Sequence, residues 1–414
     1  MCLCQLSTSD NSVASISSSG RVLAKKEGTA VITAAIGNTK ATCSVTVTKA
    51  IVVEGAALRV EKNTYFFSLE EMSSQKINAE YITGENGTPD TTKTISYTSM
   101  NTDVATVSAD GTVTPVALGT TEIILSCEGL TAYVVADVYT AGISTPSQWM
   151  DAIKDCCSKE ILTTEKRYYL ENDIDFDGVE YDIGAVANGV NSAESNPYHF
   201  GSEINGNYHS VKNITLWKED STLNPNAHQS IFGRTIGATI KNIAFENIVF
   251  NSARSYGLCA VMMHHGASGK IKDNVFTNVY ADFLYAYDAS ARKGHMAVGI
   301  TGAGYGAVMS DIFVRMRSVD GSNLKDIYEH VYGFSLAEWV WYGGNLTNVI
   351  TMIEDVPLGE AEFLNAAAGD QKYKHGKTNC YAVNTKIQAS YYAHQIFDDT
   401  VWELTPNDIP TFKK

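Results

Sequence analysis

The sequence predicts an all-β protein: two small β-sandwiches in tandem, followed by a right-handed parallel β-helix with a short capping helix at its N-terminal end. Three observations predict this fold class. Short alternating apolar runs are broken by Gly and Asn, as in strands joined by turns. One stretch occurs twice near the N-terminus, 91 residues apart. A shorter motif then recurs at steps of 29 to 38 residues in the second half of the chain.

The duplicated stretch covers residues 11–34 and 102–125. Gly20 corresponds to Gly111, and the other matching positions keep the same offset. Each copy reads as a strand, a tight turn at Ser-Gly or Asp-Gly, a second strand, a Gly turn and a third strand. This pattern predicts two small sandwiches, which we place at residues 1–50 and 51–141.

The shared string, D/N-x-x-V-A-x-V/I-S-x-x-G-x-V followed by G-T-x-x-I, resembles the bacterial Ig-like group 2 domain. The second copy contains the whole pattern, whereas the first has no counterpart of residues 58–81, the opening strands. A sandwich without these strands exposes an edge of its core. We therefore expect another chain, or an upstream segment, to complete the unit at 1–50. An isolated monomer that is monodisperse and resists proteases would count against strand donation by a neighbour.

Residues 142–160 are predicted to link the sandwiches to the β-helix and to contain the capping helix. Thr145 is its N-cap, Pro146 its first helical residue, and Gln148 completes a capping box. The apolar residues that follow are spaced at i, i+4 and i+8: Trp149, Ile153 and Cys157. Such an amphipathic helix would cover the open first turn of the β-helix and prevent edge-to-edge aggregation.

The β-helix is assigned to residues 161–414, where a short motif centred on residues 231–250 recurs. Asn or Asp residues in comparable positions are separated by steps of 29, 31, 38 and 37: Asn213, Asn242, Asp273, Asp311 and Asn348. A repeat of this length indicates stacked units, because one unit cannot bury its own apolar face. We expect Asn213, Asn242 and Asn348 to form a ladder that satisfies backbone groups from turn to turn, with ligand contact as the alternative.

Residues 168–276 resemble an extracellular β-helix family with GLUG-like repeats, and a weaker resemblance continues to residue 353. The resemblance is carried by Leu170, residues 172–176, residues 204–207, Asn213 and residues 231–233. Residues 397–412 are similar to the closing segment of such chains, so we expect the C-terminus to be natural and complete. Members occur on bacterial surfaces and in phage structural proteins. The resemblance implies an exterior location without fixing one activity.

Composition excludes several classes of partner. The formal net charge of −15 disfavours nucleic acid, whose binding requires cationic side chains. No run of 18 apolar residues occurs, so no membrane span is expected. The first ten residues lack the basic and apolar regions of a secretory signal, so a signal was removed or lies upstream, or export takes another route. None of the eight Cys residues forms a CxxC pair, which predicts neither a zinc site nor a disulfide framework.

Three carboxylates form the one candidate metal site. Asp173, Asp175 and Asp177, followed by Gly178, spell the D-x-D-x-D-G opening of a calcium loop. The twelfth position, which requires a bidentate Glu, is Gly184. Apolar residues alternate with the acids as in a half-buried strand, so a structural turn is the alternative to Ca²⁺. No other cofactor is expected.

Aromatic residues form the candidate ligand surface. Trp339 and Trp341 are two residues apart and share a strand face, next to Tyr342; Tyr285 and Tyr287 form a similar pair. Exposed rings on a β-helix can stack on sugars, because a pyranose presents apolar C–H groups to the ring. The alternative is that these rings fill the core.

The predicted function is non-catalytic: a display, adhesion or structural protein on an exterior surface. A polysaccharide lyase or hydrolase would need carboxylates, or Arg or Lys beside a base, that converge on one groove. The favoured setting is a phage virion, as a capsid decoration or tail appendage. There, residues 1–50 would contact other virion proteins, and the β-helix would recognise a glycan or receptor. The alternative is a bacterial cell-surface adhesin or glycan-binding protein, and a homo-oligomer fits either setting.

Overall fold

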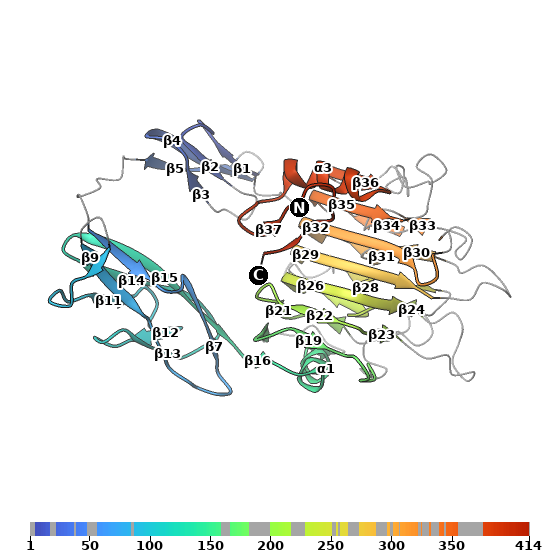
Figure 1. Cartoon of the computed structure of the whole chain (residues 1–414), viewed down its shortest axis with the longest axis horizontal. Coiled ribbons are helices and arrows are strands. Elements are labelled where there is room, and N and C mark those ends of the chain that lie inside the picture. The colour runs from blue at the N-terminus through green and yellow to red at the C-terminus, as the bar shows by residue number, and fades with distance from the viewer. Residues whose placement is uncertain are drawn as a thin grey trace.

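The computed structural model describes residues 5–16, 22–36, 39–47, 56–83, 87–158, 166–181, 199–216, 228–250, 254–255, 257–263, 273–286, 296–298, 301–305, 307–321, 324, 331–332, 339–342, 345–354 and 376–413. They form two small, mainly antiparallel β units and a stack of mainly parallel strands, in sequence order (Figure 1). The predicted fold class, tandem sandwiches followed by a helix-capped parallel β-helix, is confirmed. No helix in these ranges is long and apolar enough to cross a membrane.

The described residues of the first Ig-like unit form five strands. β1 (Gln5–Thr8), β4 (Gly28–Ile36) and β5 (Thr39–Val47) form one antiparallel sheet, and β2 (Ala14–Ile16) pairs with β3 (Val22–Ala24). Its core is small and is centred on Val13, Ala14 and Ala30. β5 is an edge strand, and within the described residues it pairs only with β4.

The second Ig-like unit contains the same five strands and five more. Its strands are β6 (Ala57–Val60), β7 (Thr64–Ser68), β8 (Gln75–Lys76), β9 (Ala79–Thr83), β10 (Thr88–Pro89), β11 (Ser96–Ser99), β12 (Ala105–Val107), β13 (Thr112–Pro115), β14 (Gly119–Cys127) and β15 (Leu130–Tyr139). They form sheets in the orders β11-β14-β15-β7, β10-β9-β6 and β12-β13-β8. β7 pairs in parallel with β15 and places Phe67 in the core, fully buried. In the second unit, β7 therefore pairs with the edge of β15 that corresponds to the edge of β5 left unpaired in the described residues of the first unit.

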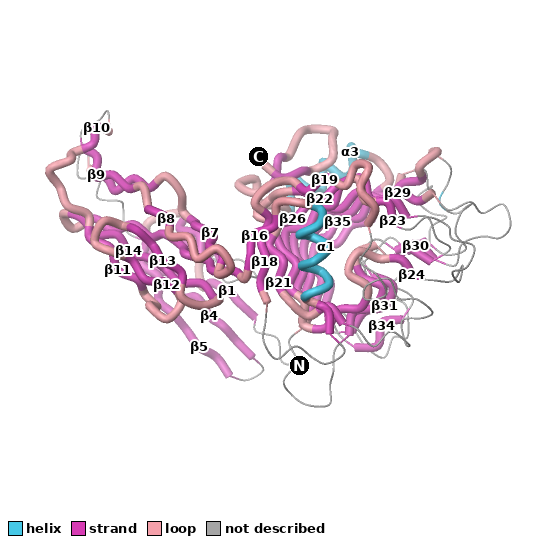
Figure 2. Tube along the Cα trace, turned by 90° about the horizontal axis from the view of Figure 1, so that it is seen from below, coloured by secondary structure: helices cyan, strands magenta, loops and turns pink. Residues whose placement is uncertain are grey.

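A helix covers the first turn of the β-helix, as predicted. α1 (Pro146–Asp155) begins after Thr145, whose Oγ1 accepts the Gln148 N–H at 3.3 Å. Trp149 is fully buried against Phe232 and Phe245 of the β-helix core. Figure 2 shows α1 lying across this end of the stacked strands. The structure differs from prediction beyond the helix, since Cys157 lies in the following strand and not on the helical face.

In the described residues, three sheets build the β-helix, and all their strands pair in parallel except β17, which is antiparallel to β20. The first has the order β16 (Ala141–Ile143), β18 (Arg167–Leu170), β21 (Glu203–Asn205), β26 (Thr239–Phe250), β29 (Asn274–Tyr285), β32 (Ala307–Ser318), β35 (Asn345–Ile353) and β36 (Gly376–Val383), with β19 (Ile174–Asp175), β22 (Ser210–Lys212) and β23 (Thr215–Leu216) beside β21 and β26. The second has the order β17 (Cys157–Ser158), β20 (His199–Phe200), β25 (Arg234–Ile236), β28 (Cys259–Met263), β31 (Thr301–Tyr305) and β34 (Trp339–Tyr342). The third has the order β24 (His228–Gln229), β27 (Arg254–Ser255), β30 (Met296–Val298) and β33 (Val331–Tyr332).

Stacking places equivalent apolar residues above one another. One inward column consists of Ile204, Ile240, Phe276, Met309 and Leu346, all at most 1% exposed. No single turn encloses these side chains, so each turn is stabilised by its neighbours.

The C-terminal segment packs on the outer face of the first sheet. It contains α3 (Lys386–Ile396), β37 (Trp402–Glu403) and β38 (Thr411–Phe412). Its buried residues include Trp402 and Ala393, which join a second apolar cluster with Phe313 and Ile350 of the sheet. The chain thus runs back along the stack, and its C-terminal end lies beside β26 and β29 (Figure 1). The first sheet is consequently covered on both faces over part of its length.

Candidate functional site

The aromatic residues predicted to contact a ligand are only partly described. Trp339, Trp341 and Tyr342 belong to β34, the last strand of the second sheet, and their side chains lie outside the described part of the structure. Tyr287 lies outside the described residues altogether. An aromatic ligand surface formed by these four residues therefore stays a prediction.

Tyr285 is a core residue, so its predicted role in ligand binding is wrong. Its side chain is completely buried in β29, and its ring stacks on Phe250 of the preceding turn at a centroid distance of 5.5 Å. Alternation along a strand shows which residues share a face, but not which face points inward.

Asp173, Asp175 and Asp177 do not converge. Asp173 Oδ1 accepts the Ser210 N–H at 3.0 Å, and Asp175 Oδ1 accepts the Asn213 amide at 2.8 Å and the Asp177 N–H at 3.0 Å. In the described part of the chain, no three His, Cys, Asp or Glu residues come together to hold a metal ion. Asp173 and Asp175 instead connect successive turns, and positions 182–184 of the twelve-residue loop lie outside the described residues, so calcium binding stays a prediction.

Asn side chains form two ladders across the turns, where one was predicted: Asn242 and Asn348 belong to the first, and Asn213 belongs to the second. In the first, amide donors lie 2.8–3.2 Å from the acceptor one turn earlier: Asn242 to Asn205, Asn278 to Asn242, Asn348 to Asp311, and Asn379 to Asn348. In the second, Asn247 donates to Asn213, and Asn213 to Asp175. The sequence repeat aligns Asp273 with Asn242, whereas the strand register places Asn278 there. These Asn and Asp residues bend the strands in left-handed backbone conformations, which Asn and Asp tolerate better than other L-residues: Asn242, Asn278, Asp311, Asn348 and Asn379.

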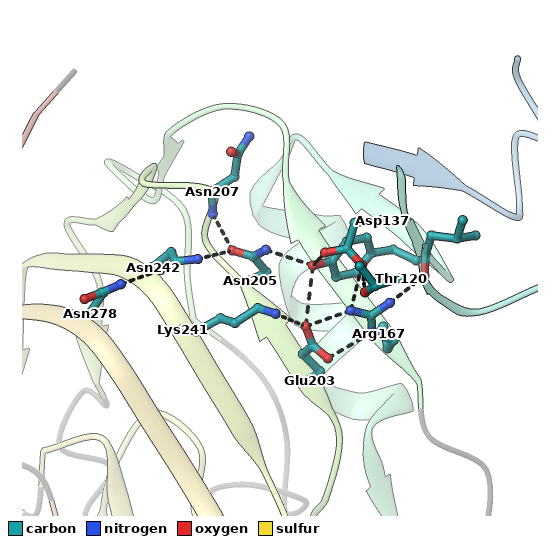
Figure 3. Close-up of polar contacts among 11 residues, drawn as sticks. Thr120, Asp137, Arg167, Glu203, Asn205, Asn207, Lys241, Asn242 and Asn278 are labelled. Atoms are coloured by element: carbon teal, nitrogen blue, oxygen red, sulfur yellow. Dashed lines mark hydrogen bonds and ion pairs between the residues drawn. The ribbon is translucent and has the colours of Figure 1, made fainter. Parts of the chain in front are cut away.

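A buried charge network joins the second Ig-like unit to the β-helix (Figure 3). Arg167 of β18 lies at its centre. Its Nη2 donates to Asp137 of β15 at 2.9 Å, its Nε donates to Glu203 of β21 at 2.9 Å, and its Nη1 donates to the Val138 carbonyl. Lys241 of β26 lies 2.7 Å from the second oxygen of Glu203. Two cations and two carboxylates from four strands thus neutralise one another at the junction.

Neighbouring polar and aromatic groups hold this network in place. The Tyr139 hydroxyl donates to Asp137 at 2.6 Å and accepts from the Asn205 amide at 2.8 Å. The Arg167 guanidinium lies 4.3 Å from the centre of the Tyr139 ring, within cation–π range. The Asn205 carbonyl oxygen accepts from Asn242, so the junction is continuous with the first Asn ladder.

Burial and charge act in opposite directions on these groups. Burial alone would raise the pKa of Glu203, but the hydrogen bond from Arg167 and the charge of Lys241 hold that pKa below its ordinary value. Burial would lower the pKa of Arg167, yet its bonds to Glu203 and the charge of Asp137 leave it raised. Burial, together with the charges of Asp137 and Glu203, raises the pKa of Tyr139. Glu203 and Arg167 therefore keep their opposite charges at neutral pH.

A cleft of about 600 Å³ opens where the C-terminal segment ends on the first sheet. Its residues come from five segments of the sequence: Asp173, Tyr208, Ser210, Ala244, Glu246, Asn247, Tyr280, Asp282, Glu403, Thr411, Phe412 and Lys413. Ser210, Ala244 and Tyr280 occupy one register column and form the floor. The tail supplies the opposite wall through Glu403, Phe412 and their neighbours.

The cleft carries four carboxylates and one lysine. Both oxygens of Asp282 accept from Arg317 of the next turn, at 3.1 and 2.9 Å, and Arg315 lies 4.0 Å away. Asp173 is close to His209 Nδ1, at 3.3 Å. Both oxygens of Asp282 thus accept charge-assisted hydrogen bonds from one guanidinium. No sequence signal identifies this cleft, because only the stacking register and the returning tail bring its residues together.

Comparison with known proteins identifies one segment. Residues 67–126 match the family model of the bacterial Ig-like domain (group 2). This match lies within the second Ig-like unit, so it leaves the resemblance of the β-helix to GLUG-like repeats as an expectation. No curated protein sequence matches the chain.

Solved structures show limited overlap. Domains 1–6 of the surface layer protein SbsC are 23% identical over 33% of this chain and 20% of that chain, with a TM-score of 0.18. SbsC domains 4 and 5 give the same identity and TM-score, over 33% of this chain and 75% of that chain. Invasin, a bacterial integrin-binding protein, is 16% identical over 28% of this chain and 26% of that chain, with a TM-score of 0.15. These overlaps support no conclusion about function. The family match shows that this chain contains a bacterial Ig-like domain of group 2 at residues 67–126.

Proposed function

We propose that the chain is a non-catalytic protein displayed on an exterior surface, in which the Ig-like units hold the β-helix as a fixed structural or recognition part. The observation that carries this proposal is the junction. β15 of the second unit continues through Thr140 into β16, the first strand of the large parallel sheet. The Thr140 N–H donates to the Arg167 carbonyl at 2.7 Å, directly beside the buried charge network.

A junction of this kind favours a fixed arrangement of the second Ig-like unit and the β-helix over a hinge between them, and a fixed arrangement suits a displayed protein. Asp137 and Arg167 are 7% and 9% exposed, so separating the two parts would bring both charges into new surroundings. Phe66 of the Ig-like unit also stacks on Tyr169 of the β-helix at 5.3 Å. Breaking a buried ion pair on one side costs about 3–5 kcal/mol. The Ig-like unit therefore transmits its orientation to the β-helix.

We further propose that the first Ig-like unit is the attachment region. In the described residues, the outer edge of β5 carries no paired strand, whereas the equivalent edge of β15 is paired with β7. A strand from a neighbouring surface or virion protein, or from upstream in the same chain, would fit this edge by β-augmentation.

Two settings follow from the sequence. We favour a phage virion, as a capsid decoration or tail appendage, and retain a bacterial cell-surface adhesin or glycan-binding protein as the alternative. The match to a bacterial Ig-like domain supports an exterior location and fits both. A homo-oligomer, formed by copies that complete one another's first unit, fits both as well.

Intact native material distinguishes the settings. An antibody against the β-helix should label unpermeabilised cells or intact particles. Mass spectrometry of purified particles should recover the chain in a fixed ratio to capsid or tail proteins if the virion setting is right. Recovery with an outer-surface anchor would favour the cell surface. A chain that becomes accessible only after the envelope is broken would contradict display altogether.

One observation favours the alternative of a polysaccharide lyase or hydrolase, because several carboxylates line the same cleft. The bidentate contact of Asp282 with Arg317 supports the non-catalytic proposal instead. Incubation with neutral and acidic polysaccharides should release neither reducing ends nor unsaturated products. Release that disappears on Glu403→Gln, with the fold intact, would establish the enzymatic alternative.

A further inference from the structure

The cleft beside the C-terminal tail combines an aromatic wall with a buried hydroxyl that has no hydrogen-bond partner among the described residues. Ser210 is 3% exposed, and its Oγ meets no donor or acceptor in that part of the chain. Val211 points into the core, so Ser210 lies on the opposite, outer face of β22 and lines the cleft. Burying a hydroxyl without a partner is unfavourable, and a ligand hydroxyl in the cleft would remove that penalty.

The aromatic wall is held in a conformation that the local sequence does not favour. Tyr208 adopts φ 65°, in the left-handed region where a bulky residue is an outlier. The turn is fixed against β26, since the Tyr208 N–H donates to the Asn242 carbonyl at 2.8 Å. A Cβ on Gly206 would lie 2.4 Å from that carbonyl oxygen, so only glycine allows this close approach. The Tyr208 ring remains 37% exposed and meets Phe412 edge to face at 5.5 Å.

The remaining lining determines which ligands fit. Asp173, Glu246 and Glu403 supply carboxylate oxygens, which accept hydrogen bonds from hydroxyl groups. Against four carboxylates the cleft lining contains one cation, Lys413, so an anionic ligand would be repelled. Asp282 is already paired with Arg317, which reduces the attraction for a cationic ligand. The volume of about 600 Å³ lies in the range of small-molecule sites, about 300–1,000 Å³.

We propose that this cleft is a binding subsite for a neutral glycan. A pyranose C–H face would stack on Tyr208, and its hydroxyls would donate to the carboxylates and bond with Ser210 Oγ. The inference rests on the proposed role of the β-helix in recognition. It assigns that role to a different surface from the Trp339 strand, and it names the ligand class.

Binding by the purified full chain tests the proposal. Neutral gluco-, manno- and galacto-oligosaccharides are titrated by calorimetry, beside uronate oligomers and amino-sugar oligomers of equal length. At least one neutral series should bind, with little dependence on salt, and the uronate series should not. Binding confined to the amino-sugar or uronate series, or no binding at all, would overturn the proposal.

Two variants locate the binding in the cleft. Tyr208→Asn removes the ring while keeping a residue that tolerates the left-handed conformation, and it should weaken neutral-glycan binding about five- to tenfold. Ser210→Ala removes a buried hydroxyl, so Tm should hold or rise while affinity falls about three- to tenfold. Tyr133→Ala, at an exposed tyrosine of β15, is the matched control and should leave affinity unchanged. Equal affinity in the parent, Tyr208→Asn and Ser210→Ala would place the ligand elsewhere and overturn the cleft.

These measurements are independent of the proposed display. If the chain is labelled on intact cells or particles but binds no neutral glycan, the cleft inference fails and display stands. If the purified chain binds neutral glycan but is not accessible on any surface, the site stands and display fails.

Discussion

In the first Ig-like unit, β5 has no buried position, whereas β15, its counterpart 91 residues later, has five. The two strands pair in the same way with β4 and β14, over nine residues each. Even a strained glycine is shared: Gly28 and Gly119 have φ values of 147° and 144°, and each lies against a valine, Val13 or Val104. The difference therefore comes from what covers these strands. β7 lies along β15, and Phe67 fills the core beneath it.

This comparison shows that strands with small apolar residues at the same alternate positions can form an outer surface or a core wall. Its pairing is determined by local turns and alternation, while its burial depends on strands from elsewhere in the chain or from another chain. The first unit retains a hydrophobic pattern on a face that is only partly covered, which is the reason to expect a partner strand there.

The largest effect is expected from Phe67→Ala, which removes the side chain by which β7 closes the second unit. Because Phe67 is fully buried, the free energy of unfolding of this unit should fall by about 3–5 kcal/mol, measured by chemical denaturation. Tyr133→Ala, at an exposed tyrosine in the same sheet, should change it by less than about 0.5 kcal/mol. Equal stability of the Phe67 variant and the parent would refute the idea that β7 makes the difference between the units.

Arg167→Met tests whether the β-helix also helps to keep the second unit in place. It leaves Asp137 and Glu203 buried without their shared cation, so the junction should weaken by about 3 kcal/mol or more. Limited proteolysis between residues 139 and 167 should accelerate. Arg59→Met removes an exposed ion pair with Glu80 and serves as the matched control, with a loss of at most about 1 kcal/mol. A junction that is equally resistant in both variants would show that backbone pairing alone holds it.

Acidification should loosen the same junction. The folded-state pKa of Glu203 lies below its ordinary value of 4.5, so its carboxylate contributes stability that is present above about pH 4.5. That contribution is lost as the pH falls through the folded-state pKa. The thermal midpoint should therefore decline between pH 5 and pH 3, and the decline should be smaller in Arg167→Met, where the partner is already absent. An identical pH profile in both proteins would assign the acid sensitivity to other groups.

The reactivity of Cys43 tests the comparison without any expected change in stability. Cys43 occupies in β5 the place that Val134 occupies in β15, yet it is exposed where Val134 is 1% exposed. In the isolated chain, a thiol reagent should modify Cys43 rapidly, as mapped by peptide mass spectrometry. Cys127 should react slowly, because burial excludes the reagent and raises its pKa.

Protection of Cys43 reports completion of the first unit. Cys43 should become unreactive in the native assembly, or when a peptide of residues 57–83 supplies the missing strands in trans. A Cys43 that reacts equally fast in the assembly and in the isolated chain would exclude the β5 edge as the attachment surface.

The sequence is informative where structure depends on near neighbours. The strand pattern of the Ig-like units, the N-cap at Thr145 and the existence of an Asn ladder all follow from short motifs. α3 was not predicted, although Thr385 and Gln388 repeat the T-x-x-Q spacing found at the start of α1. Its buried residues are small, namely Ala389, Ser390 and Ala393, so it lacks a pronounced apolar stripe.

Features that depend on register or on distant segments were harder to predict. The ladder residue Asn278 lies five residues after Asp273, the position that the sequence repeat aligns with Asn242, because loops of unequal length shift the turns. The Tyr285 side chain points into the core, and the alternation of residues along a strand does not show which face of the strand is buried. The cleft needs both the stacking of β22, β26 and β29 and the return of the tail across them. No local pattern in the sequence encodes that combination.

The returning tail has a mechanical consequence. Phe412 meets Tyr208, which belongs to an early turn of the stack close to the junction with the second Ig-like unit. A pulling force applied between that unit and the end of the tail would enter and leave the β-helix near the same turns. The later turns, from β29 to β36, would carry little of the load until the tail had been peeled from the sheet. Most of the β-helix would thus lie outside the path of the force, and its later turns would keep their structure while the chain was stretched.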